Sequence, residues 1–408
     1  MKIARAAFFT SLATSCAALP FAMADVVSPR RASTIAVGPA RGAMTMARVD
    51  PERRGATALP LPKGSLRVLF KKSISAVFDQ PALVNSNGEI LAVSSRGDLF
   101  TLTPEGEEKQ RVIRGGLGVG PAALLSNGTL LFVTAHEEAI GIRDGAVVFE
   151  AHLSQSGTSA PRAAPLPLSE GGAVVATGSE LIVIDSQGAI RARTKVGEPP
   201  ALPLIRAPQE VISIASTGTV YAWPLRGESR RIGAFSTGVQ GAAALLPPST
   251  LLATLSGGGQ IAAFDLATGL SSARATPSNG SFVGPPTLAG DALFALGTSG
   301  SQLYAAELNR EGGEAGRTAL TLLPMTDAGP QIQGQLGPLV DSNRTLVFAS
   351  ADGQIGSVSG GGVDTLGEKI CSFEYRGSLA GLSPSPDGAF IALCRNGTIA
   401  KIGSLRPQ

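Results

Sequence analysis

Short apolar runs separated by glycine-rich turns recur along most of this chain, and Thr250–Thr276 shows the pattern most clearly. An apolar run at Leu251–Leu255 is followed by three consecutive glycines and then by a second apolar run at Ile261–Phe264. Asp265 and the pair Thr268-Gly269 mark another turn before a weaker third run. Glycine permits the positive φ that a tight reversal needs, so the pattern predicts three short antiparallel strands.

The pattern occurs eight times between about residue 80 and the C-terminus. When the apolar runs that follow the turns are aligned, successive repeats are 40, 42, 39, 41, 42, 52 and 44 residues apart. The aligned positions are Leu99, Ala139, Leu181, Val220, Ile261, Leu303, Ile355 and Ile399. A period near forty that is built from strands and turns is typical of propeller blades. The sequence therefore predicts an all-β fold, an eight-bladed β-propeller of four-stranded antiparallel blades.

The last repeat lacks a fourth strand, because only six residues follow Thr398–Ile402. At the other end, Leu66–Ser73 reads as a strand that precedes the first full repeat. We expect this strand, at about residues 66–73, to join the last blade, because a ring closed in this way leaves no open sheet edge. Residues 65–408 would then form one eight-bladed propeller domain.

Residues 1–24 have the features of a secretory signal peptide. Lys2 and Arg5 precede an apolar stretch over residues 6–19, and Ala22-Met23-Ala24 matches a cleavage site. The apolar stretch is shorter than the ~20 residues that span a bilayer, so a membrane anchor is the weaker interpretation. Lipid attachment at Cys16 is a further alternative, although this cysteine lacks the preceding pattern of a bacterial lipobox. We expect an exported protein, periplasmic or extracellular, with no transmembrane segment after signal removal.

Residues 25–64 are predicted to be a flexible basic leader. They are rich in proline, glycine, alanine and arginine, and they carry seven basic residues against three acidic ones. A solvated linker is the simpler interpretation, and adhesion to an anionic envelope surface is the alternative. Residues 65–408 carry a net charge of about −3 without a basic stripe, which argues against nucleic-acid binding.

Several repeats share a motif in which a turn glycine or serine precedes an apolar run. Gly218–Trp223, Gly259–Gly269 and Ser301–Glu307 carry it most clearly. These strings resemble the repeats of PQQ-like β-propellers, and the resemblance extends over roughly residues 65–408. That family includes quinoprotein alcohol dehydrogenases and the non-enzymatic propeller of the bacterial outer-membrane assembly machinery. The resemblance therefore implies a propeller fold and either a PQQ-dependent dehydrogenase-like quinoprotein or a binding scaffold.

Residue types that a quinoprotein enzyme requires are scarce in this chain. The enzymes of this family carry tryptophans on the fourth strands of their repeats, whereas the only tryptophan here, Trp223, lies on a third strand. We expect Trp223 to pack between blades. His136 and His152 are the only histidines and have no metal-binding spacing. We therefore identify no catalytic, cofactor-binding or metal-binding residue and predict no cofactor, while a hydrolase or lyase site assembled in the central channel from distant residues stays an alternative.

Cys371 and Cys394 are the cysteines left after signal removal, and export favours a disulfide between them. The blade assignment argues against it. Cys371 would lie on the outer strand of blade seven and Cys394 on the second strand of blade eight. Facing sheets are ~10 Å apart, whereas a disulfide joins Cα atoms within ~7 Å. A bonded pair and two buried thiols both stay open, with thiols slightly favoured.

Two repeats depart from the common pattern. The second has Ala135–Glu138 where the others have a turn glycine, so we expect its hairpin to differ locally. The sixth interval is about ten residues longer than the others, and the surplus lies in Asn309–Gln335. Long excursions from a rigid scaffold often carry binding sites, although a tolerated surface insertion is the commoner case. The candidate partner-binding residues in this loop are Arg310, Glu311, Glu314, Met325 and Asp327.

The function most consistent with these features is that of a non-catalytic, exported β-propeller. It would serve as a protein- or ligand-binding scaffold in the bacterial envelope or outside the cell, with a protein partner in the cell envelope.

Overall fold

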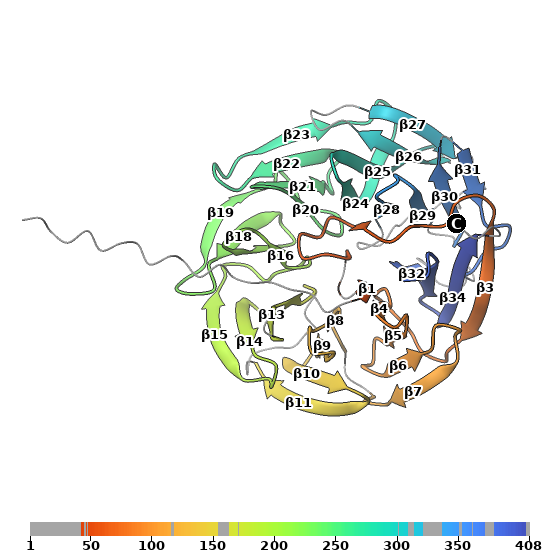
Figure 1. Cartoon of the computed structure of the whole chain (residues 1–408). Helices are drawn as coiled ribbons and strands as arrows, with labels where there is room; N and C mark the ends of the chain where they lie inside the picture. Colours follow the sequence, from red (N-terminus) through yellow and green to blue (C-terminus); the bar gives the residue numbers. More distant parts are fainter. Residues whose placement is uncertain are drawn as a thin grey trace, which may run out of the picture. The chain divides into compact units, whose positions relative to one another are not determined.

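Eight antiparallel sheets stand side by side in a ring in the computed structural model (Figure 1). The structure describes residues 42–44, 46, 48–115, 118–153, 163–169, 171–300, 302–308, 314–320, 337–350, 353–360, 362–371 and 379–404. Each sheet contains four strands that neighbour one another in a blade, and two sheets gain a fifth strand from the N-terminal region. The prediction of an all-β, eight-bladed propeller is confirmed.

The strands of each blade follow one another from the channel outward. Blades one to four consist of β4 (Leu83–Asn85), β5 (Ile90–Val93), β6 (Leu99–Leu102) and β7 (Glu108–Val112); β8 (Ala123–Leu124), β9 (Leu130–Val133), β10 (Glu138–Arg143) and β11 (Ala146–His152); β12 (Leu166–Pro167), β13 (Ala173–Thr177), β14 (Glu180–Ile184) and β15 (Ile190–Lys195); and β16 (Ile205–Arg206), β17 (Val211–Ile214), β18 (Thr219–Trp223) and β19 (Arg230–Ala234).

Blades five to eight continue the same arrangement. They consist of β20 (Ala244–Leu246), β21 (Thr250–Thr254), β22 (Ile261–Asp265) and β23 (Ser271–Ala275); β24 (Ser281–Ala289), β25 (Ala292–Ser299), β26 (Gln302–Leu308) and β27 (Glu314–Leu320); β28 (Leu339–Asp341), β29 (Leu346–Ala349), β30 (Ile355–Ser359) and β31 (Gly362–Thr365); and β32 (Leu379–Pro384), β33 (Phe390–Cys394), β34 (Thr398–Ser404) and β3 (Leu66–Ser73).

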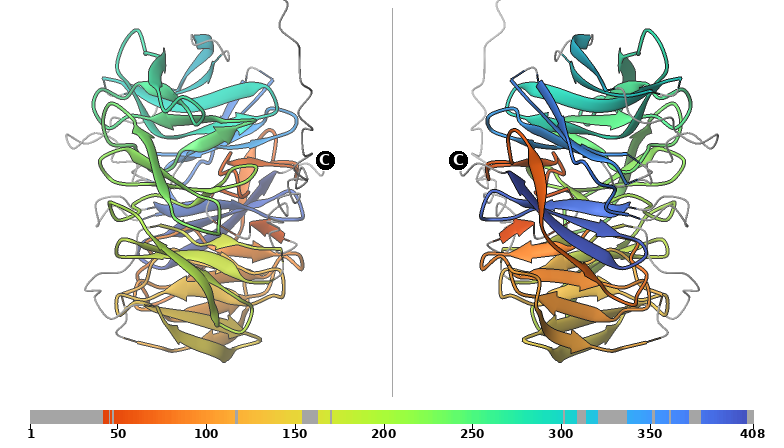
Figure 2. Two further views of the ribbon diagram at one scale, coloured as in Figure 1. Left: turned by 90° about the vertical axis from the view of Figure 1, so that its left-hand side faces the viewer. Right: turned by 90° about the vertical axis from the view of Figure 1, so that its right-hand side faces the viewer.

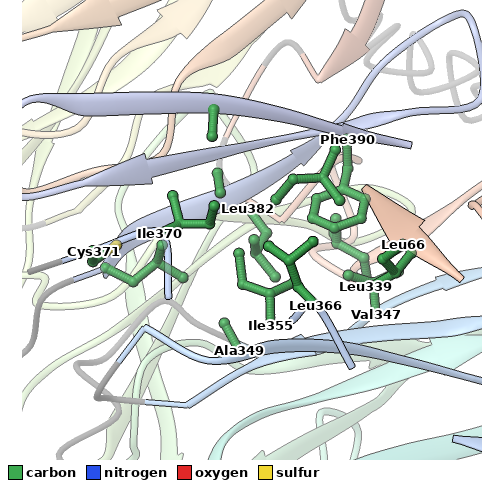
Figure 3. Close-up of a cluster of buried hydrophobic side chains, with 14 of the residues drawn as sticks. Leu66, Leu339, Val347, Ala349, Ile355, Leu366, Ile370, Cys371, Leu382 and Phe390 are labelled. Atoms are coloured by element: carbon green, nitrogen blue, oxygen red, sulfur yellow. The ribbon is translucent and has the colours of Figure 1, made fainter. Parts of the chain in front are cut away.

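The repeat alignment corresponds to one structural position. All eight aligned residues lie in the third strand of their blade, and all eight are buried. The buried side chains form eight hydrophobic clusters, each of which lies between two neighbouring blades. Figure 3 shows the cluster between blades seven and eight, where Leu339 and Ile355 face Leu382 and Phe390. Trp223 is fully buried in the cluster between blades three and four, as its predicted packing role requires.

The outer strand of the last blade comes from the other end of the chain. Leu66–Ser73 forms β3 and pairs antiparallel with β34, from Leu66 opposite Ser404 to Ser73 opposite Thr398 (Figure 2). Lys401 of β34 is buried and ties this blade to the first one. Its Nζ pairs with Asp387 Oδ2 at 2.7 Å and donates to Pro104 O at 2.9 Å. Both ends of the propeller sequence therefore lie in one sheet.

The second blade keeps the common turn without its glycine. Glu137 adopts a φ of 58°, and its N–H donates to Thr134 O at 3.0 Å. In the first blade, Gly97 donates to Ser94 O in the same way at 2.9 Å. The expectation of a locally different hairpin is therefore wrong, because a glutamate takes the left-handed conformation that glycine adopts more easily.

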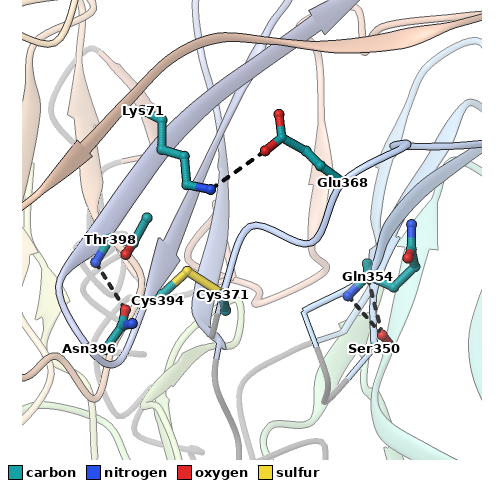
Figure 4. Close-up of a disulfide and its surroundings, with 8 residues drawn as sticks. All are labelled: Lys71, Ser350, Gln354, Glu368, Cys371, Cys394, Asn396 and Thr398. Atoms are coloured by element: carbon teal, nitrogen blue, oxygen red, sulfur yellow. Dashed lines mark hydrogen bonds and ion pairs between the residues drawn. A yellow bond between two sulfur atoms is a disulfide. The ribbon is translucent and has the colours of Figure 1, made fainter. Parts of the chain in front are cut away.

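A disulfide joins Cys371 and Cys394, with 5.5 Å between their Cα atoms (Figure 4). The argument that favoured two thiols fails because Cys371 does not lie on an outer strand. The strand β31 ends at Thr365, and Ile370 then donates its N–H to Gly353 O at 3.4 Å, beside the β29–β30 turn. The chain therefore reaches the end of β33 from its connecting segment, where the spacing between facing sheets does not apply.

We expect reduction of this disulfide to lower the stability of the propeller. Cys371 and Cys394 are 23 residues apart in the sequence. Reduction of their bond restores conformational entropy to the unfolded chain, which lowers the free energy of unfolding by about 3 kcal/mol. The measurement is the urea midpoint with and without reductant, followed by fluorescence of Trp223. The variant Cys371→Ser with Cys394→Ser serves as the control, because it should show the lower midpoint and no response to reductant. Equal midpoints for the oxidised and reduced protein would contradict the bond's contribution.

Candidate functional site

The N-terminal strap, defined here as residues 42–62, lies inside the ring. It belongs to the segment that composition predicts as a flexible leader, yet residues 42–64 share one compact unit with the propeller. Figure 1 shows this red segment between the inner strands of the blades. The basic, aperiodic composition misled the prediction because the strap is held by backbone groups and guanidinium contacts, which leave no apolar period in the sequence. Residues 1–41, with the predicted signal peptide and Cys16, lie outside the described residues.

Both ends of the strap extend inner sheet edges. The strand β1 (Gly42–Met44) pairs antiparallel with β4 of blade one, with Gly42 opposite Asn85. The strand β2 (Ala56–Thr57) pairs in parallel with β28 of blade seven, with Ala56 opposite Val340. These additions make blades one and seven five-stranded.

Between these ends, the strap carbonyls contact successive blades. Blades four, five and six each donate one inner-strand N–H to the strap at 2.9 Å: Arg206 N to Pro51 O, Leu245 N to Glu52 O, and Leu288 N to Arg54 O. Inner strands are sheet edges, and the N–H groups on their channel side need acceptors. The strap supplies one acceptor per blade, so it follows the inner wall of the ring from blade to blade.

Arg53 anchors the middle of the strap, with none of its surface exposed. Its Nε donates to Leu204 O and its Nη2 to Pro165 O, both at 2.8 Å, so one guanidinium joins blades three and four. Burial lowers the pKa of Arg53 to about 9, although the nearby carboxylates of Asp50 and Glu52 act in the opposite direction. The charge is therefore held by carbonyl dipoles in a site of low polarity.

Arg48 occupies a second buried position, near blades six and seven. Its Nη2 donates to Thr287 Oγ1 at 3.0 Å and also contacts Pro286 O. Two glycines make room for the guanidinium, since an added Cβ would lie 2.5 Å from it at Gly55 and 2.1 Å from it at Gly337. Burial lowers the pKa of Arg48 to about 10, against the opposing effect of Asp50.

The C-terminal end of the strap is fixed by a buried carboxylate. Asp341 accepts the N–H of Leu61 through Oδ2 at 2.9 Å, while its Oδ1 accepts those of Asn343 and Thr345 at 2.8 Å. The last two contacts form an Asx turn. The side chain of Leu61 is fully buried in the cluster between blades seven and eight. Aspartate therefore closes a β-turn and holds the strap at once.

A groove of about 780 Å³ opens between blades one and two. Both aliphatic and polar side chains line this groove. The aliphatic residues are Leu91, Leu99, Leu124, Leu130 and Ile142, and the polar ones include Asn85, Asn87, Glu89, Lys109, Gln110, Ser126, Asn127, Arg143 and Asp144. The hydrogen bond from Lys109 holds the pKa of the Glu89 carboxyl below its usual 4.5, against the effect of burial and with help from Asn85. An apolar floor with a charged rim is the usual form of a ligand groove.

Exposed aliphatic side chains lie on β11 and just after β7, the outer strands of blades two and one. Ile113 follows β7 and is 71% exposed, and Val147 and Val148 of β11 are also exposed. Arg114 and Glu150 form an ion pair that connects the same two outer strands. The outer rim of blades one and two therefore combines apolar surface with paired charges, a combination common in protein interfaces.

Of the loop residues predicted as sites, one lies among the residues that the structure describes. Glu314 is the first residue of β27, whereas Arg310, Glu311, Met325 and Asp327 lie outside the described residues. His136 and His152 are exposed, and His152 Nδ1 lies 3.3 Å from Glu138 Oε1. Among the described residues, no three histidine, cysteine or acidic side chains gather as a metal site. Within the same part of the chain, no helix has the length and apolar character needed to cross a membrane.

Comparisons with known proteins support the fold. No family model matches the chain, and no curated protein matches it. Among solved structures, the chain is similar to BamB from Moraxella catarrhalis, with a TM-score of 0.57 and 17% identity over 83% of this chain and 98% of that one. It is also similar to the computationally designed Ika8 protein, with a TM-score of 0.57 and 13% identity over 81% and 97%.

A third similar structure is virginiamycin B lyase from Staphylococcus aureus, with a TM-score of 0.49 and 12% identity over 83% of this chain and 99% of that one. For BamB and Ika8, identities this low indicate a shared fold and no more. By fold, the chain is an eight-bladed β-propeller, and a strap from its own N-terminal region lies inside the ring.

Replacing Arg53 should destabilise the propeller far more than replacing its neighbour. In Arg53→Met, Leu204 O and Pro165 O lose a charged donor in a buried site, and we expect a loss of about 2 kcal/mol or more. In the matched control Arg54→Met, a half-exposed ion pair with Asp50 is lost, and we expect a loss of less than about 1 kcal/mol. Urea unfolding of both variants measures the difference. Equal stabilities would mean that the buried guanidinium contributes nothing.

Proposed function

We propose that this protein is a non-catalytic binding scaffold that engages a protein partner through its outer surface. The observation that carries the proposal is the strap, which lies along the inner strands of blades four to seven and of blade one. Its guanidinium groups bind carbonyl oxygens that would otherwise face the channel. The ring's own chain thus covers much of the inner surface on which a central site would be built, so we place the envelope partner on the outer surface.

The outer rim and groove of blades one and two form the proposed partner surface. Ile113, Val147 and Val148 supply exposed apolar contacts, and the groove between these blades offers a recess for an anchoring side chain. The rim carries both signs of charge, in Glu89 and Lys109, so it can orient a partner without favouring polyanions. The excursion within residues 309–335, the surface predicted from sequence, stays a second proposed contact region.

The repeats support membership of the PQQ-like propeller family, and the similarity to BamB fits a propeller of the non-enzymatic kind. We extend the proposal to location: residues 1–24 act as a signal peptide, and the mature protein works in the bacterial envelope or outside the cell. The disulfide between Cys371 and Cys394 is consistent with an oxidising compartment.

We expect a photo-crosslinking residue placed at position 113 to capture an envelope protein. The control position is Leu270, which is 70% exposed against 71% for Ile113 and lies at the turn before β23 of blade five. Crosslinks are formed in intact cells, and the adducts are identified by mass spectrometry in the envelope fraction. One defined adduct at 113 that is absent at 270 supports the proposal. The same adducts at both positions, or none at 113, would overturn the assignment of this surface.

A further inference from the structure

We propose that the inner wall of the ring is a peptide-binding site for an arginine-bearing turn that is flanked by two short strands. The strap would be its resident peptide, and the strap of a second copy of this chain could replace it. This inference goes beyond the proposed function, because it concerns the channel side of the blades and needs no outer partner.

The strap is held in the manner of a bound peptide. Short strand additions at β1 and β2 and single hydrogen bonds to blades four, five and six leave the four strands of every blade complete without it. Strand addition to an exposed edge is a general mode of peptide recognition, in which backbone hydrogen bonds give affinity and side-chain pockets give specificity. The wall of inner strands therefore binds two short stretches of the strap as added strands, and it binds the turn between them through single hydrogen bonds and the arginine side chains.

Two guanidinium sockets give the wall its specificity. The first presents Leu204 O and Pro165 O to the guanidinium of Arg53. The second presents Thr287 Oγ1, which donates its own hydrogen to Pro338 O at 2.6 Å and is thus oriented to accept from Arg48. Planar arrays of carbonyl and hydroxyl acceptors fit the donor fork of arginine better than a lysine ammonium. The sockets therefore select arginines five positions apart on a turn, in which Arg53 N–H donates to Asp50 O at 2.9 Å.

The strap can be separated from the ring at one place. Lys63 is exposed, and Gly64 has a φ of 75° with no atom near the position of an added Cβ. The strand β3 begins at Leu66 and is held by its own pairing with β34. A break between residues 63 and 64 would leave every blade intact, so binding of the strap can be measured apart from folding of the ring.

The segment that fits both sockets is the strap sequence itself, so we take the strap of a second copy as the exchanging occupant. In the intact chain the covalent link gives the resident strap an effective concentration of about millimolar or higher. Exchange should therefore be rare in the intact chain and become measurable once the link is cut.

The test uses the full chain with a protease recognition sequence inserted between Lys63 and Gly64. The protein is folded first and then cleaved, and circular dichroism verifies that the ring stays folded. A fluorescein-labelled peptide with the sequence of residues 42–62 is added as the probe, and its anisotropy reports binding. We expect the cleaved strap to elute with the ring and the labelled peptide to replace it.

The same peptide with Arg53→Lys should bind about 10-fold more weakly or worse, because lysine cannot reproduce the two donors in the socket. The peptide with Arg54→Lys is the matched control and should bind within about 3-fold of the original, since Arg54 is half-exposed. Loss of the folded ring on cleavage, failure of the labelled peptide to bind the folded ring, or equal affinity of the Arg53→Lys peptide would each overturn the proposal. None of these outcomes bears on the crosslinks at position 113.

Discussion

The inner strands of this propeller are sheet edges that surround a channel, and their unpaired N–H and C=O groups constrain the rest of the structure. Six of the eight inner strands are only two or three residues long, which limits the exposed edge. On blades four, five and six, one inner-strand N–H of each blade donates to a strap carbonyl. On the outer side of the ring, β3 supplies the fourth strand of the last blade. The same N-terminal region therefore serves both edges, with the strap inside and β3 outside.

Arginine side chains are rarely buried, yet Arg53 and Arg48 are both buried where they hold the strap inside the ring. Desolvation disfavours the charged form of Arg53 and Arg48, as the lowered pKa values show. Carbonyl oxygens from two blades offset this cost, because hydrogen bonds to a charged donor are stronger than those to a neutral one. A methionine or leucine would avoid the desolvation but leave the carbonyls unpaired. The guanidinium therefore joins blades whose backbone groups an apolar side chain could not satisfy.

The propeller could be predicted from sequence because its repeats are local. Each blade carries its own turn and its own apolar runs, and eight copies reinforce one another, so the residues aligned with Ile261 all occupy the third strand. The turn at Glu137 could not be predicted, because a non-glycine residue in the left-handed conformation leaves no compositional signal. The disulfide was misjudged because Cys371 lies beyond its expected strand.

The strap was missed for a more general reason. Its contacts join residues hundreds of positions apart, such as Leu61 with Asp341, and most use the backbone, which carries no sequence code. The signals that could have indicated it are weak: Met44, Met46 and Leu61 are apolar residues scattered through a charged segment, and all three are buried. The groove of blades one and two could not be predicted for a related reason. Its lining comes from two repeats, and the sequence pattern does not distinguish these two from the other repeats.

The central claim is that the strap is part of the inner wall of the ring. Amide hydrogen exchange of the full chain, followed by mass spectrometry on peptides that cover residues 42–62 and the inner strands, tests it most directly. The account predicts slow exchange in the strap and at Arg206, Leu245 and Leu288, whose N–H groups it accepts. Exchange of residues 42–62 at the rate of an unstructured chain, with those three amides equally unprotected, would contradict it.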